Sequence, residues 1–172
     1  MFTEFSRLPT HILLVHAVVV LLPLTAVLLV LCATWPAVRR RTGVVLPALA
    51  LVSLGLVPLT THAGEWLERR VSPSPLLHAH TELGDSLLPW AFGLFVVGAA
   101  VWLAHRLAAS PLSDDAAGRP GGTVLRVALI VVAVVVAAGT VVQTYRVGES
   151  GARAAWQGQF SQQAAPRQHD DD

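Results

Sequence analysis

The chain has 172 residues, of which 53% are hydrophobic and only 13% are charged, and its mean hydropathy is +0.58. These values exclude an ordinary soluble domain, in which about a quarter of the residues are charged. The formal net charge of +1 gives no basic excess of the kind that binds nucleic acid. We therefore expect the lipid bilayer as the surroundings of this chain and no nucleic-acid partner.

Four continuous apolar runs follow one another along the chain, at residues 12–34, 44–61, 87–107 and 124–142. Each approaches the ~20 residues that a helix needs to cross ~30 Å of hydrocarbon. Strands are excluded because the runs do not alternate with period two and because a bilayer accepts only helices or closed barrels. The sequence predicts an all-α integral membrane protein, a four-transmembrane-helix bundle of residues 1–156, followed by a disordered polar tail at 157–172.

The runs and links have distinct local features. The first run is too long for the apolar region of a signal peptide, so we expect it to be a retained helix. Pro23 and Pro58 fall inside the first two runs, where each removes a backbone donor and is expected to kink its helix. The link at 36–43 is short enough for a tight hairpin, whereas the link at 63–85 is long enough to include a surface helix. Gly139 offers a small surface for close helix contact in the fourth run.

An arginine cluster predicts the orientation of the bundle. Three consecutive arginines, Arg39 to Arg41, lie in the shortest link, where the positive-inside rule is most reliable. We therefore expect this link to be cytoplasmic and both chain termini to be extracytoplasmic. The protein is then a multi-pass protein of the cell membrane. The single cysteine, Cys32, lies in an apolar run and excludes a disulfide within one chain.

This topology gathers most of the histidines and several carboxylates at the outer side of the bilayer. Ionisable groups at the edge of a membrane are costly, so their clustering is the most specific functional feature of the sequence. The candidate cofactor-binding residues are His16, His62, His80 and His11. The candidate metal ligands are His78, Glu82, Asp85 and Glu65. Within the second set, the first three residues follow the spacing i, i+4, i+7 and share one helix face, which leaves His80 on another side.

Helical spacing limits which histidines can cooperate. His11 and His16 are five residues apart, about 140° around an ideal helix, so only one of them is expected to face a given point. His16 is the deeper of the two, and we expect it to pair with His62 or His80. Imidazoles from different helices that meet at one depth can ligate b-type haem or a transition metal. The other interpretation is that these histidines hydrogen-bond to carboxylates and kinked backbone, or titrate at the membrane surface.

Four stretches of the chain are characteristic: LPTHILLVHAVVVLLPLTA, THAGEWLERRV, HTELGDSLLPW and YRVGESGARAAW. Together they resemble the bacterial four-helix membrane proteins of the domain of unknown function 2231 (DUF2231), in an actinobacterial form, over about residues 8 to 156. The resemblance implies a compact four-span fold and a cell-membrane location, and it implies no established activity. According to the resemblance, the histidines of the family correspond to His11, His16 and His80. Its closing glycines correspond to Gly148 and Gly151. The wider family often has histidine after the first closing glycine, where this chain has Glu149.

Three classes of function follow from these observations. The leading hypothesis is a histidine-lined site for haem b or a transition metal near the outer surface, in an electron-transfer context. The alternative is a non-catalytic membrane subunit or assembly factor that packs against other membrane proteins or forms a homo-oligomer. A proton-linked or small-solute transporter ranks last, because the third and fourth runs carry no charged residue at mid-depth. No phosphate loop, hydrolase elbow or H-E-x-x-H motif is present, so the sequence assigns no enzyme activity.

Overall fold

The computed structural model of the chain describes residues 4–5, 8–108 and 120–157. The predicted polar tail therefore lies, apart from residue 157, outside the described residues, as does most of the link between the third and fourth runs. In chain order the elements are β1 (Glu4–Phe5), β2 (Leu8–Pro9), α1 (Thr10–Thr34), α2 (Pro36–Thr42), α3 (Val45–Glu68), α4 (Pro75–Asp85), α5 (Leu88–Ala108) and α6 (Pro120–Trp156). The two short strands pair antiparallel just before α1.

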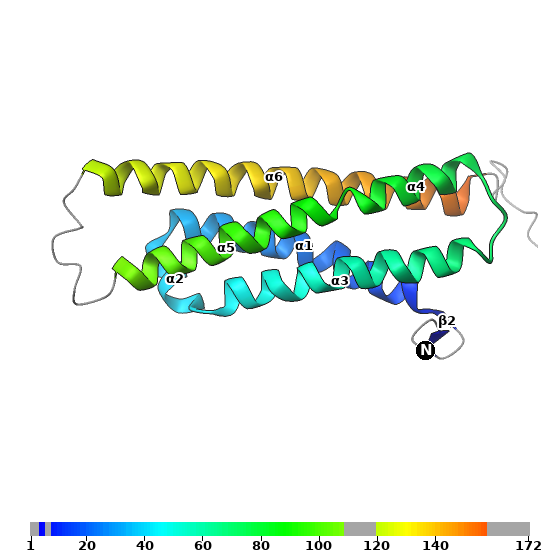
Figure 1. Cartoon of the computed structure of the whole chain (residues 1–172), viewed down its shortest axis with the longest axis horizontal. Helices are drawn as coiled ribbons and strands as arrows, with labels where there is room; N and C mark the ends of the chain where they lie inside the picture. The colour runs from blue at the N-terminus through cyan, green and yellow to red at the C-terminus, as the bar shows by residue number, and fades with distance from the viewer. Residues whose placement is uncertain (1–3, 6–7, 109–119, 158–172) are drawn as a thin grey trace, which may run out of the picture.

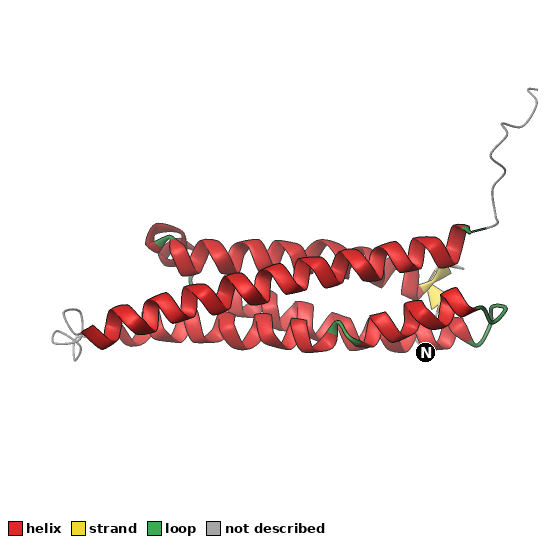
Figure 2. Cartoon of the chain, turned by 90° about the horizontal axis from the view of Figure 1, so that it is seen from above, coloured by secondary structure: helices red, strands yellow, loops and turns green. Residues whose placement is uncertain are grey.

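The helices confirm the predicted all-α architecture with four membrane spans. Within the described ranges, four helical stretches are long and apolar enough to cross a membrane, namely α1, α3, α4 together with α5, and α6. They run alternately in opposite directions along one long axis (Figure 1), and Figure 2 shows the same alignment from above. α1 packs against α3 and α6, and α5 packs against the same two helices, so the four spans close into a ring. This is the topology of an up-and-down four-helix bundle.

The core of the bundle is mostly apolar and includes a hydroxyl contact between two spans. Leu22 and Leu29 of α1 and Leu94 of α5 are fully buried there. Between them, Oγ1 of Thr25 lies 3.2 Å from Oγ of Ser53 and joins α1 to α3. Each of these hydroxyls also donates to a carbonyl of its own helix. Such hydroxyl contacts are accepted inside membranes because every polar group keeps a partner.

Two of the helices are longer than their apolar runs. α3 continues to Glu68 and α6 to Trp156, whereas the runs end at residues 61 and 142. The difference arises because hydropathy predicts the part of a helix that lies in lipid and not the polar turns that continue it. At 1.5 Å per residue, the 37 residues of α6 extend roughly 55 Å, well beyond the ~30 Å of hydrocarbon. The bundle therefore projects out of the membrane.

The links have the structures that their lengths predicted. α2 is a short helix with Pro36 in its first turn, and Gly43 ends it with a φ of 51°, in the left-handed region that favours glycine. The long link contains a helix, α4, which continues into α5 as one candidate span, so its place at the membrane surface stays a prediction. Pro75 lies in the first turn of α4, and Oγ of Ser74 accepts a hydrogen bond from the amide of Leu77. Pro23 and Pro58 lie inside α1 and α3, and the kinks expected there stay predictions.

The bundle has two chemically different ends. The first turns of α1, the last turns of α3 and α6, and all of α4 lie together at one end (Figure 1), which we call the histidine end. At the opposite end lie α2, the last turns of α5 and the first turns of α6, which we call the arginine end after Arg39, Arg40 and Arg41. Which of the two faces the cytoplasm stays a prediction from the arginine cluster.

Candidate functional site

His11 joins the beginning of α1 to the end of α3. Its Nδ1 lies 2.9 Å from the backbone carbonyl oxygen of Thr60. Its ring lies against Gly64, one turn further along α3, where a Cβ atom would be 3.0 Å from Cε1 of His11. That distance is shorter than almost any real Cβ contact, so the glycine is what lets the imidazole approach the helix backbone.

His80 makes the corresponding contact between α4 and α6. Its Nδ1 lies 3.0 Å from Oγ of Ser150. Its ring lies against Gly151, where a Cβ atom would be 2.9 Å from Cε1 of His80. Both histidines are therefore partly buried, and each rests on a glycine of a neighbouring helix while its Nδ1 is engaged in a hydrogen bond.

The two imidazoles, which we call the histidine pair, lie at the same end of the bundle, one in the first turn of α1 and the other on α4 (Figure 1). The residues that hold them come from α3, through Thr60 and Gly64, and from α6, through Ser150 and Gly151. Four elements that are far apart in the sequence thus contribute to a single histidine pair.

Hydrogen-bond geometry assigns the tautomer of both rings. The carbonyl of Thr60 can only accept, so Nδ1 of His11 carries the hydrogen. The hydroxyl of Ser150 donates to the carbonyl of Val147 at 2.9 Å, so its oxygen accepts from Nδ1 of His80. In the neutral state each Nε2 then has a lone pair, and His80 has a further hydrogen-bonding contact with the backbone of Val147. Two nitrogen donors are therefore available at the histidine end.

The structure does not bring together the pair that helical spacing favoured, which was His16 with His62 or His80. His16 is exposed on α1, and its Nδ1 lies 2.6 Å from the carbonyl of Ile12 in the same helix. The side chain of His62 is 83% exposed, with its Nδ1 3.8 Å from Oε2 of Glu65. The reason is the rotation of about 140° over five residues, which turns His11 toward α3 and His16 away from it.

The candidate metal ligands lie on exposed faces. Nε2 of His78 lies 3.5 Å from Oε1 of Glu82, and both side chains are more than two-thirds exposed. Asp85 is exposed at the end of the same helix, and Glu65 is exposed on α3. Among the residues that the structure describes, no group of three or more histidines, cysteines, aspartates or glutamates could hold a metal ion. His78 and Glu65 each lie near an oppositely chargeable partner on an exposed surface, and the metal site built from these residues stays a prediction.

Sequence reasoning missed three contributors to the histidine pair, namely Thr60, Gly64 and Ser150. The sequence could have indicated a close contact at Gly64, because an isolated glycine in a helical stretch usually has a packing reason. The closing glycines differ from each other: Gly151 contacts His80, whereas a Cβ atom at Gly148 would meet nothing within 4 Å. Glu149, at the position where the wider family often has histidine, pairs with Arg153 at 2.6 Å.

Comparison with known proteins places the chain in a family but assigns no chemistry. A family model described as "Predicted membrane protein (DUF2231)" matches residues 7–164. The match includes all four spans and both members of the histidine pair. No curated protein and no solved structure matches the chain. The description names a location and no reaction, so the chemistry of the site has to be argued from its residues.

Proposed function

Because the chain belongs to the DUF2231 family of predicted membrane proteins, whose description names no reaction, we propose a function from the histidine pair. We propose that the protein binds haem b or a single transition-metal ion through Nε2 of His11 and Nε2 of His80. The observation that supports the proposal is the placement of two partly buried imidazoles from different helices at one end of the bundle, each with its Nδ1 in a hydrogen bond to a further helix.

The hydrogen bonds of the pair are of the type that supports metal ligation. A metal-binding histidine commonly donates its other ring N–H to a backbone carbonyl or another acceptor, which fixes the tautomer and raises the basicity of the ligating nitrogen. Thr60 supplies a carbonyl to His11, and Ser150 supplies a hydroxyl oxygen to His80. Both supports lie on rigid helices, so the orientation of each ring is set before a ligand arrives.

Two imidazoles would suffice to hold haem, and His11 and His80 would be the residues that hold it. This number favours haem or another two-ligand centre over a structural zinc site, which takes four ligands. An iron or copper centre would supply one-electron chemistry at this position. The protein's own contribution is to hold the two nitrogens, and the glycines at 64 and 151 keep the rings close to the backbones of α3 and α6.

Anaerobic purification in mild detergent, followed by optical spectra and elemental analysis, tests the proposal. Bound haem gives a Soret band that shifts on reduction, whereas a bound metal ion without haem appears in elemental analysis alone. We expect His11→Ala and His80→Ala each to lose the bound group. The matched controls, His16→Ala and His62→Ala, remove exposed histidines and should retain it. A colourless, metal-free protein that stays so after reconstitution with haem, iron and copper would rule out the proposal.

A second candidate function is that of a non-catalytic subunit or assembly factor in a larger membrane complex. The observation that favours it is that α6 is the least buried span. Of its most apolar stretch, 17% is buried, compared with 28% in each of the other spans. The exposed face of α6 is rich in valine and is free to pack against another membrane helix. Stoichiometric co-purification with a larger complex would support this role, and normal assembly of that complex without the chain would count against it.

A further inference from the structure

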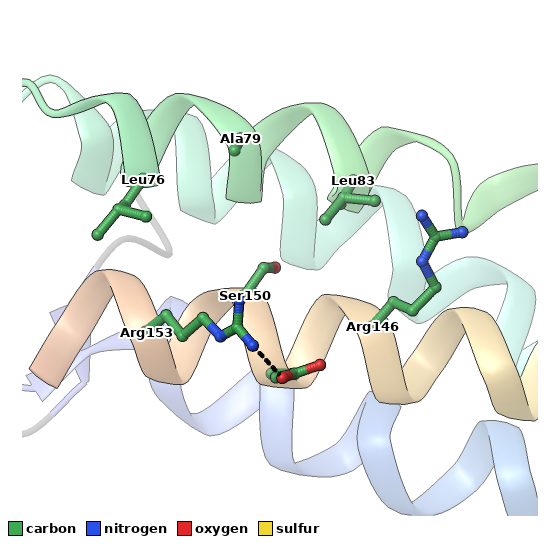
Figure 3. A pocket seen from close by; sticks show the side chains of 7 residues that line it. Leu76, Ala79, Leu83, Arg146, Ser150 and Arg153 are labelled. Atoms are coloured by element: carbon green, nitrogen blue, oxygen red, sulfur yellow. Dashed lines mark hydrogen bonds and ion pairs between the residues drawn. The ribbon is translucent and has the colours of Figure 1, made fainter. Parts of the chain in front are cut away.

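A cavity of about 240 Å³ lies between α4 and the last turns of α6. Figure 3 shows its two walls, one from each helix. The α4 wall consists of Leu76, Ala79 and Leu83, and the α6 wall consists of Arg146, Glu149, Ser150 and Arg153. Ser150 also binds His80, so the cavity adjoins the histidine pair without including either imidazole.

The two walls differ in polarity. On α4, Leu76, Ala79 and Leu83 follow the spacing i, i+3, i+7 and form an apolar stripe, and both leucines point toward α6 in Figure 3. The facing stripe of α6 carries charged side chains. Where an apolar stripe faces charged side chains, the charged groups gain no polar partner from it and the apolar groups gain no apolar contact. A ligand with a charged part and an apolar part would satisfy both walls.

The net positive charge of the α6 wall favours an anionic ligand. Nη2 of Arg153 lies 2.6 Å from Oε1 of Glu149, so these two side chains largely neutralise each other. Arg146 is exposed and has no ion pair among the described residues. Two arginines and one glutamate leave one net positive charge on this wall. Arginine presents several N–H donors in a planar fork, which suits the oxygens of a phosphate group.

The depth of Arg146 indicates where the anion comes from. Arg146 follows Val142, the last residue of the apolar run of α6, by four residues, which is ~6 Å along the helix. This is the layer just beyond the hydrocarbon, where the phosphate groups of lipids lie. Arginines in this layer attract anionic lipid headgroups. A membrane lipid is therefore the anion that this cavity is positioned to meet.

A second cavity supplies room for an acyl chain. It measures about 460 Å³, lies between α1 and α6, and shares Glu149 with the first cavity. Its remaining walls are mostly apolar and include Val19 and Pro23 of α1 and Val141 of α6. A lipid whose head lies beside α4 thus has an apolar surface beside α1 for its tail.

We propose that the space between α4 and α6 binds the phosphate headgroup of an anionic phospholipid. Arg146 and Arg153 are its cationic partners, Leu76 and Leu83 cover its glycerol end, and an acyl chain follows the groove between α1 and α6. This site is independent of the proposed haem or metal centre, because it uses neither histidine.

Native mass spectrometry of the full chain, stripped of lipid in detergent, tests this site with phosphatidylglycerol and phosphatidylcholine as probes. We expect phosphatidylglycerol to be retained preferentially. Arg146→Gln should weaken its retention about fivefold, the effect of one arginine near an anionic surface. The matched control is Arg126→Gln, an exposed arginine of the same helix outside both cavities, which should change nothing. Glu149→Gln should strengthen retention, because it removes the negative charge beside Arg153.

Four outcomes would overturn the proposal. The first is equal retention of the two lipids by the unmodified chain. The second is equal loss in Arg146→Gln and Arg126→Gln. The third is no gain in Glu149→Gln. The fourth is stabilisation of the unmodified chain by inorganic phosphate alone as strongly as by phosphatidylglycerol, which would identify a site for a soluble anion. Since Glu149→Gln keeps both arginines, it remains informative if Arg146→Gln folds poorly.

Discussion

The two ends of the bundle are held together in different ways. At the histidine end, hydrogen bonds join residues 49 and 70 positions apart, His11 with Thr60 and His80 with Ser150. At the arginine end, Arg39 donates to the carbonyl of Cys32 across seven positions, and the side chains of Cys32 and Thr42 meet across ten. One end is thus fixed by contacts between distant helices and the other by a short link.

This difference shows where the arrangement of the helices is specified. Apolar helices gain no hydrophobic attraction for one another in lipid, so close packing and polar contacts between helices decide which helices become neighbours. Two of those polar contacts, His11 with Thr60 and His80 with Ser150, lie at the histidine end, and a third, Thr25 with Ser53, lies within the bundle. Substitutions at the histidine end are expected to change how the helices assemble, whereas substitutions at the arginine end should change only the local hairpin.

The largest expected difference in the free energy of unfolding is between alanine substitutions at two glycines of the spans. A Cβ atom at Gly139, in the half nearer the histidine end, would overlap the ring of Trp90, whereas one at Gly98 would make ordinary contacts with Leu46 and Ala50. Gly139→Ala should lower the free energy of unfolding by about 1–3 kcal/mol through overpacking. Gly98→Ala should be neutral or stabilising by up to about 1 kcal/mol, since alanine favours a helix. Denaturant unfolding in detergent measures both, and equal effects would contradict the close packing at Trp90.

A smaller effect is expected from Gln143, which is buried and links α6 to the junction of α4 and α5. Its Nε2 donates to the hydroxyl of Ser86 and, at 3.5 Å, to the carbonyl of Leu83. Gln143→Leu should cost about 1 kcal/mol, as is typical of hydrogen bonds between membrane helices. It should also speed hydrogen exchange in α4. Thr42→Val is the control at the arginine end and should leave exchange in α4 unchanged; faster exchange there in both variants would show that the two ends are coupled.

The smallest effects are expected from the exposed ion pairs. Glu82→Gln and Glu65→Gln remove the partners of His78 and His62 on exposed surfaces. Such pairs contribute less than about 1 kcal/mol, so each variant should unfold within about 0.5 kcal/mol of the unmodified chain. Neither should lose a bound haem or metal ion. Loss of that group in Glu82→Gln would instead support the predicted metal site that includes His78.

The number of spans and the clustering of histidines were predictable because both depend on where residues fall along the chain. Four apolar runs fix four crossings, and alternate crossings return the ends of the runs to the same side. The length of the long link also predicted that it contains a helix, which is α4. The spacing on α4 also predicted correctly that His80 lies on a different face from His78 and Glu82.

Which histidines turn toward neighbouring helices was not predictable in the same way. It depends on the rotation of each helix about its own axis, and α1 is apolar all round, so no polar face fixes its rotation. Depth alone favoured His16, but the packing of His11 on Gly64 decides which side of α1 faces the bundle. Contacts such as that of Ser150 with His80 join helices far apart in the sequence, and spacing within one helix carries no information about them.

Cysteine cross-linking tests most directly the proposal that His11, and not His16, lies close enough to His80 to share a ligand with it. In a Cys32→Ser background, the double variant His11→Cys with His80→Cys should form an intramolecular cross-link with a short bifunctional thiol reagent. The matched double variant, His16→Cys with His80→Cys, should form far less. Mass spectrometry of the intact chain distinguishes one bridging reagent from two singly attached ones. Equal or stronger cross-linking in the His16 variant would contradict the histidine pair on which the proposed function depends.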